Sequence, residues 1–132
     1  MSDFDFAVYA SSFNTTDEAS FVERFYTDDM VLDGPFGKLE GRDKWLDILN
    51  QTHKGVREDL NFLTVVCQGD VIMAESEGTF TALIDLPEFQ HGPLSKGESI
   101  TVKFFSKYVI RDGKISEMKI SWWDPNLRPP LG

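Results

Sequence analysis

The sequence is poor in cysteine and in basic side chains. One cysteine, Cys67, occurs in 132 residues, so no disulfide can form within the chain, and a reducing compartment is indicated. Lysine and arginine number 13 against 22 aspartate and glutamate residues, which gives a formal net charge of −9. This balance argues against binding to nucleic acid or to an anionic membrane surface, because both attract proteins through basic side chains.

Long apolar runs, metal-binding spacings and nucleotide-binding motifs are also missing. No apolar run approaches the ~18 residues that span a membrane, and the acidic start MSDFD holds no apolar stretch of a secretory signal. The two histidines are far apart, and neither a CxxC nor an HxH spacing occurs. GxGxxG, Walker and GxSxG sequences are absent as well. We therefore expect a cytoplasmic protein with no metal, no cofactor, no nucleic acid partner and no membrane association.

Apolar and aromatic residues, by contrast, are plentiful. They make up 41% of the chain, and phenylalanine alone occurs 11 times, which is enough for one hydrophobic core at this length. The sequence contains no repeat and no linker. It therefore predicts a single domain over residues 1–125, followed by a mobile tail, residues 126–132, which has two prolines and no periodicity.

Helical periodicity dominates the first third of the chain, and strand alternation dominates the rest. A capping box at Thr15 and Glu18 predicts the start of the second helix. We expect three helices over 6–14, 15–27 and 42–53, and five strands over 30–33, 61–68, 71–83, 100–110 and 116–122. Residues 36–41 are expected to form a loop. This order predicts an α+β fold in which three N-terminal helices pack on the concave face of a curved, mainly antiparallel sheet.

The last two strands have a clear alternation of apolar and polar residues on either side of a turn at Arg111–Asp112–Gly113. A two-residue Asp-Gly turn would mix the apolar and polar faces of the two strands. A three-residue turn with Gly113 in a bulge instead pairs Phe104 with Ile120 and keeps the faces separate, so we expect the three-residue turn. A slip of one residue would turn one strand inside out.

Two segments, and the order of the elements around them, resemble the nuclear transport factor 2-like superfamily and in particular its SnoaL-like branch. The segments are FYTDDMVLDGPFGKLEGRD (25–43) and YVIRDGKISEMKISWWD (108–124). The resemblance implies a cone-shaped half-barrel whose mouth admits an apolar small molecule, and a homodimer formed through the outer face of the sheet. The superfamily includes ketosteroid isomerases, polyketide cyclases, dehydratases, limonene epoxide hydrolases and noncatalytic binding proteins, so the fold does not settle the function.

The ketosteroid isomerase pattern places a tyrosine on the first helix, an aspartate base on the first strand and a protonated aspartate on the penultimate strand. In this sequence the three positions fall on Tyr9, Asp33 and Ser106. Serine is a weaker donor to an oxyanion than a protonated aspartate. A gap-free match of TDDMVLDGP puts Gly34 at the base position instead.

The limonene epoxide hydrolase pattern matches in one half only. Its Trp-x-Asp motif fits Trp122 and Asp124. At the positions of its Arg-x-Asp motif, this sequence has Glu75 in place of the arginine and Glu77 in place of the aspartate. Epoxide hydrolysis is therefore poorly supported. The resemblance to SnoaL-type cyclases implies a single aspartate base in an apolar pocket, which Asp33 or Asp124 would supply.

Three residues are catalytic candidates, and each has a structural alternative. Asp33 is either a base in an apolar pocket or the start of the turn at Gly34. Tyr9 either donates a hydrogen bond to a developing enolate or is one more aromatic residue of the core. Asp124 lies two residues beyond Trp122, at the end of an apolar wall, or simply ends its strand.

Other residues are expected to line the pocket or to cover the outside of the sheet. The pocket wall is predicted to comprise Trp45, Phe104, Tyr108 and Trp122, with Ser106 as a donor and His91 in a loop over the mouth. His53 is expected to interact with the end of its helix. Apolar residues on the opposite face predict a homodimer interface that includes Phe105, Val109 and Trp123.

These residues favour an enzyme that needs no cofactor and acts by proton transfer on an apolar, carbonyl-bearing small molecule. Isomerisation, aldol-type cyclisation and dehydration all fit that description. The alternative is a noncatalytic module that binds a hydrophobic ligand or a protein partner.

Overall fold

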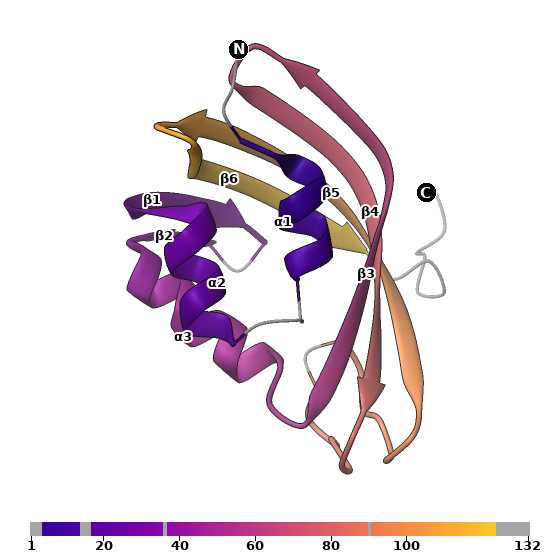
Figure 1. Cartoon of the computed structure of the whole chain (residues 1–132). Coiled ribbons are helices and arrows are strands. Elements are labelled where there is room, and N and C mark those ends of the chain that lie inside the picture. The colour runs from indigo at the N-terminus through magenta and orange to yellow at the C-terminus, as the bar shows by residue number, and fades with distance from the viewer. Residues whose placement is uncertain (1–3, 14–16, 36, 90, 124–132) are drawn as a thin grey trace.

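The computed structural model describes residues 4–13, 17–35, 37–89 and 91–123. In this part of the chain, three helices and six strands follow one another (Figure 1): α1 (Phe6–Ser12), α2 (Glu18–Phe25), β1 (Tyr26–Gly34), β2 (Gly37–Glu40), α3 (Arg42–Thr52), β3 (Val56–Gln68), β4 (Val71–Ala82), β5 (Ser99–Arg111) and β6 (Lys114–Trp123). The tail 126–132, predicted to be mobile, lies outside the described residues.

The strands form one curved, open sheet in the order β2-β1-β6-β5-β4-β3. Neighbouring strands are antiparallel except β1 and β6, which run parallel. The helices lie on the concave side of this sheet (Figure 1). The predicted α+β fold is therefore confirmed, and the sheet is mixed because β1 enters it directly from α2 and pairs with the last strand. The prediction of a loop over 36–41 is wrong, because Gly37–Glu40 pairs with β1 as the edge strand β2.

Aspartate side chains begin the first two helices. The carboxylate of Asp5 accepts from the backbone N–H of Ala7 and Val8 at 3.0 and 3.2 Å, and that of Asp17 accepts from the N–H of Ser20 at 2.9 Å. Each satisfies backbone donors that the first turn of a helix leaves free. The prediction of a capping box starting at Thr15 is wrong, because Asp17 occupies the N-cap position.

The turn between β5 and β6 differs from the prediction. Asp112 and Gly113 both have positive φ, 53° and 75°, which is typical of a two-residue type I′ turn. A bulge in β6 beyond Lys114–Ile115 then shifts the pairing, so that Phe104 lies opposite Trp122 instead of Ile120. The predicted register is wrong by two residues, and an even error leaves every side chain on the expected face.

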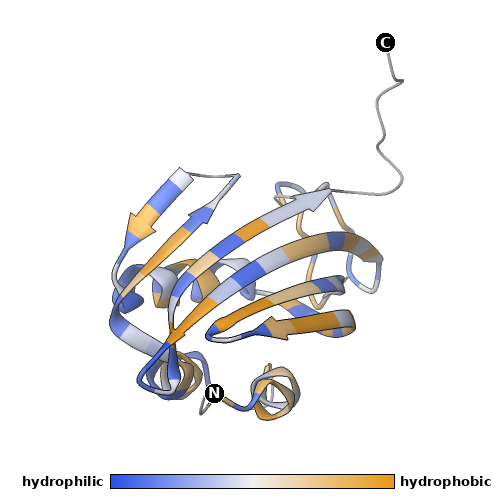
Figure 2. Cartoon of the chain, turned by 90° about the horizontal axis from the view of Figure 1, so that it is seen from above, coloured by the Kyte–Doolittle hydropathy of each residue, from blue (hydrophilic) through white to orange (hydrophobic). Residues whose placement is uncertain are grey.

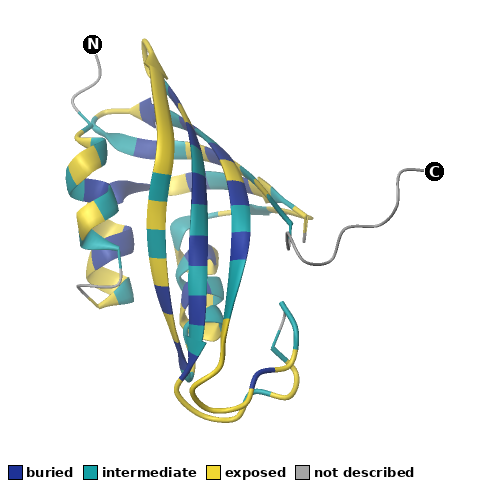
Figure 3. Ribbon diagram, turned by 90° about the vertical axis from the view of Figure 1, so that its right-hand side faces the viewer, coloured by how far each residue is buried: buried dark blue, intermediate teal, exposed yellow. Residues whose placement is uncertain are grey.

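Apolar and polar residues alternate along the long strands (Figure 2), and burial alternates with them (Figure 3). On β4 the inward side chains Ile72, Ala74, Ser76, Phe80 and Ala82 are buried, whereas Met73 is exposed. The inward residues belong to two clusters. One lies under the helices, and the other, Val56, Phe80, Val102 and Phe104, lies towards the far end of the sheet.

Candidate functional site

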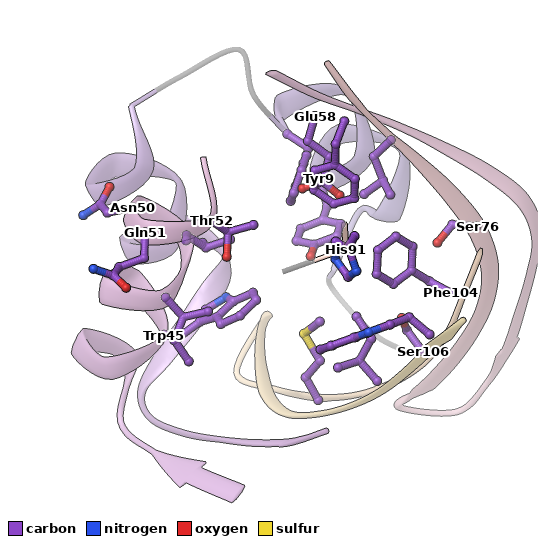
Figure 4. Close-up of a pocket in the computed structure, with 18 of the residues that line it drawn as sticks. Tyr9, Trp45, Asn50, Gln51, Thr52, Glu58, Ser76, His91, Phe104 and Ser106 are labelled. Atoms are coloured by element: carbon purple, nitrogen blue, oxygen red, sulfur yellow. The ribbon is translucent and has the colours of Figure 1, made fainter. Parts of the chain in front are cut away.

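A cavity of about 760 Å³ opens between α3 and the concave face of the sheet, which is within the range of small-molecule sites. Side chains of α3, such as Trp45 and Thr52, face Phe104 and Ser106 of β5 across it (Figure 4). Many of the residues in its walls are aromatic. The ring of His91 lies 5.0 Å from that of Phe80 and 5.6 Å from that of Trp122 between centroids.

The structure brings most of the predicted pocket residues together. Residues that line the cavity include Trp45, His91, Phe104, Ser106, Tyr108 and Trp122, and also Tyr9. They come from α1, α3, β5, β6 and the loop that follows β4. The side chains that the sequence alternation predicts to face inward therefore line the same cavity.

The two aspartates that the sequence proposed as bases are not found there. Asp33 is exposed on β1, between Lys38 of β2 and Lys119 of β6 in the sheet register, while its neighbour Leu32 is fully buried. The structure therefore does not bring Asp33 to the cavity, because the strand turns Leu32 inward instead. Asp124 lies outside the described residues.

A carboxylate that the sequence interpretation passed over does line the cavity. Glu58, on β3, has a side chain that is only 8% exposed. Its Oε1 lies 2.8 Å from Nε2 of His53. A buried carboxylate in an apolar cavity is a candidate for acid–base chemistry.

Space for Glu58 comes from a glycine on the neighbouring strand. A β-carbon at Gly78 would lie 2.8 Å from Oε2 of Glu58 and 2.9 Å from Cε2 of Phe104, closer than non-bonded atoms approach. The absence of a side chain at Gly78 thus allows the carboxylate and the ring to lie on the inner face of the sheet. Oε2 has no hydrogen-bond partner within the ranges that the structure describes, so it is available to a ligand.

His53 contacts a carboxylate through each of its ring nitrogens. Nδ1 lies 2.6 Å from Oε1 of Glu18, and Nε2 contacts Glu58 as described. Desolvation lowers the pKa of His53, but the hydrogen bonds and charges of Glu18 and Glu58 outweigh it and raise the pKa to about 9. His53 is therefore a cation at neutral pH. The three side chains are no metal site, because the carboxylates lie at opposite sides of the ring; no group that could hold a metal occurs among the described residues.

The chain's three tyrosines gather beside the cavity. The hydroxyls of Tyr9 and Tyr26 are 2.7 Å apart, and either can be the donor. Burial raises the pKa of Tyr9 well above its usual value, and the nearby Tyr26 and Tyr108 raise it further. Burial also raises the pKa of Tyr26 and of Tyr108. The cluster therefore stays protonated and neutral, and offers hydroxyl donors to a bound oxygen atom.

One signal in the sequence could have identified Glu58. Val56, Glu58, Leu60 and Phe62 alternate with more polar residues, as in a half-buried strand. An acidic residue on the apolar side of such an alternation is unusual, because an ionised group is rarely buried without a partner. The strand was expected to begin at residue 61, whereas β3 begins at Val56. Glu58 therefore lay outside the predicted strand and was not assigned to its inner face.

Comparisons with known proteins agree with this architecture. A family model described as a SnoaL-like domain matches residues 7–118. Among solved structures, a proposed polyketide cyclase from Xanthomonas campestris pv. campestris superposes with a TM-score of 0.73 at 20% identity, covering 88% of this chain and 85% of its own. IdmH, a proposed polyketide cyclase from Streptomyces antibioticus, does so with a TM-score of 0.73 at 20% identity, over 89% and 88%.

A more distant structure is an LEH-like epoxide hydrolase of M. tuberculosis, with a TM-score of 0.68 at 12% identity, over 89% of this chain and 79% of its own. No curated protein sequence matches the chain. At these identities the solved structures establish a shared fold only. Within the described ranges, no helix is long and apolar enough to cross a membrane.

Proposed function

Because the chain belongs to the SnoaL-like domain family, we propose that its cavity binds an apolar, carbonyl-bearing small molecule and moves a proton on it without a cofactor. The observation that carries the proposal is Glu58, a buried carboxylate with one oxygen held by His53 and the other open to an aromatic cavity. Isomerisation, aldol-type cyclisation and dehydration all begin with such a proton transfer beside a carbonyl.

Glu58 is the proposed base. The C–H proton beside the carbonyl passes to Oε2, and the electron pair of that bond moves towards the carbonyl oxygen, which becomes an enolate. Aromatic walls keep water away, so that electrostatic interactions within the cavity are stronger than in bulk solvent. Asp124 stays a second proposal for the base, since it lies two residues after Trp122 of the cavity wall in the sequence.

Hydroxyl groups at the cavity wall are the proposed donors to the enolate oxygen. The Tyr26 hydroxyl can donate either to Sδ of Met118, at 3.8 Å, or to Tyr9, and in the second arrangement the proton of Tyr9 is free for a ligand. Ser106 and His91 also line the cavity and are further candidates. Donors that already point towards the position of a developing charge stabilise it without reorganisation.

The proposal can be tested with 5-nitrobenzisoxazole, an apolar probe with an acidic C–H bond. A base removes the proton from carbon 3, the electron pair completes a nitrile, and the N–O bond breaks to give a coloured phenolate. We expect saturable release of this phenolate, inhibited competitively by an apolar ketone such as 2-acetylnaphthalene. A rate no higher than that of acetate at the same concentration, together with tight binding of the ketone, would favour the noncatalytic binding module instead.

We also propose that two copies of the chain associate through the convex face of the sheet. Apolar side chains lie exposed there on adjacent strands, namely Val66, Met73 and Phe105, with Trp123 stacked beside Phe105 at 5.2 Å between ring centroids. We call these four residues the outer patch. A two-fold axis would place each patch against its copy, and the flanking pair Lys103–Glu77 would lie at the rim.

Phe105→Lys is expected to weaken this dimer at least about tenfold, because it puts a charge at the centre of an apolar contact. Leu83→Lys is the matched control, since Leu83 is equally exposed, at 50% against 51% for Phe105, but lies outside the outer patch. Sedimentation velocity over a range of concentrations gives the dissociation constants. A monomeric wild type, or equal weakening by both variants, would rule out this interface.

A further inference from the structure

Glu18, His53 and Glu58 form a continuous array from the surface to the cavity. Glu18 comes from α2, His53 follows the end of α3, and Glu58 belongs to β3. The exposed fraction of the side chain falls from 24% for Glu18 to 9% for His53 and 8% for Glu58. The backbone N–H of His53 also donates to the carbonyl of Leu49 at 2.9 Å, which fixes the residue at the helix end.

Both ring nitrogens of His53 face carboxylate oxygens, and a carboxylate can only accept. A neutral imidazole has one N–H and can satisfy one of these acceptors, whereas an imidazolium satisfies both. The ring of Phe13, which lines the cavity, lies perpendicular to the His53 ring at 5.7 Å between centroids. Both carboxylates therefore receive a hydrogen bond only when both ring nitrogens of His53 carry a proton.

We propose that His53 is a positioning residue for Glu58, and that Glu18 keeps His53 in the doubly protonated form. This inference rests on the proposed function. His53 occupies Oε1 of Glu58 and thereby leaves Oε2 directed into the cavity. When His53 loses a proton, only one of the two carboxylates keeps its hydrogen bond, and Glu58 loses the cation that holds Oε1.

The charged groups that face the His53 ring in the described structure are Glu18 from α2 and Glu58 from β3. The other titratable side chains at the cavity wall are Asp47, Tyr9, Tyr108 and His91. Glu18 does not line the cavity and is the most exposed member of the array, so its replacement tests the array without altering the ligand site.

The test compares Glu18→Gln with Glu23→Gln, a control on the same helix whose side chain is exposed. The His53 ring is titrated by NMR, and the elimination of 5-nitrobenzisoxazole is followed from pH 5 to 10. In the wild type and in Glu23→Gln we expect the ring to titrate near pH 9 and kcat to fall with the same midpoint. In Glu18→Gln both midpoints should move to lower pH by about one unit or more, with KM unchanged.

His53→Gln is a second variant, because glutamine retains a single donor and no charge. Its kcat should be reduced about tenfold or more and should show no inflection near pH 9, with KM again unchanged. Unchanged midpoints in Glu18→Gln, or an inflection that persists in His53→Gln, would overturn the inference. If the wild type shows no turnover, the proposed function fails, and the NMR titration alone decides whether Glu18 holds the proton on His53.

Discussion

Glu58→Gln is expected to lower kcat for the elimination of 5-nitrobenzisoxazole by about 10²–10⁴-fold, the usual contribution of a general base. Glutamine has nearly the same shape and still accepts a hydrogen bond from His53, but it cannot take up the substrate proton. The KM should change little, because the aromatic walls that hold the probe are untouched. Stopped-flow or steady-state absorbance of the phenolate product measures both constants.

Asp33→Asn is the matched control for this variant. Asp33 was one of the two aspartates proposed as the base on sequence grounds, and the structure places it on the exposed side of β1. Its replacement should leave kcat within about twofold, as expected for a surface position away from the site. Asp124→Asn completes the comparison. Loss of activity in Asp33→Asn or Asp124→Asn with full activity in Glu58→Gln would show that the base has been assigned to the wrong residue.

The free energy of unfolding should fall by about 3 kcal/mol between pH 6 and pH 9.5. The pKa of His53 is about 9 in the folded protein, against about 6.5 in an unfolded chain. Because the folded value is the higher one, the stabilisation is complete below pH 6.5 and is lost as the pH rises through 9. Urea unfolding at several pH values between 6 and 9.5 measures this fall.

His53→Gln provides the comparison, because a residue that does not titrate contributes no pH dependence. The variant should be less stable than the wild type at pH 6 and about equal to it at pH 9.5. Its unfolding free energy should then be nearly flat across that range. A wild-type stability that does not change between pH 6 and 9.5 would mean that Glu18 and Glu58 do not hold His53 as a cation.

The faces of the long strands could be predicted because alternation in the sequence records burial directly. Phe104, Ser106, Tyr108 and Trp122 were all placed on the inner face, and all line the cavity. This holds although the turn was predicted wrongly. A bulge in β6 moved the register by a second residue, and such a bulge leaves little trace in local sequence, since it depends on how two strands pair.

The catalytic candidates were harder to predict because their surroundings come from distant parts of the chain. Whether Asp33 faces inward depends on the pairing of β1 with β2 and β6, which no local pattern reports. Glu58 contacts His53, five residues earlier at the end of α3, and His53 in turn contacts Glu18 of α2, which is 40 residues from Glu58 in the sequence. An unusual acid on an apolar face was visible in the sequence, but its partners required the fold.

The most direct test of the cavity as the functional site is a crystal structure of the protein with 2-acetylnaphthalene. We expect the naphthalene rings to lie between Trp45 and Phe104, with the methyl group of the ketone next to Oε2 of Glu58. The carbonyl oxygen should lie within hydrogen-bond distance of a hydroxyl group such as that of Tyr9. A ligand bound elsewhere, or one inside the cavity with its methyl group remote from Glu58, would contradict the assignment of Glu58 as the base.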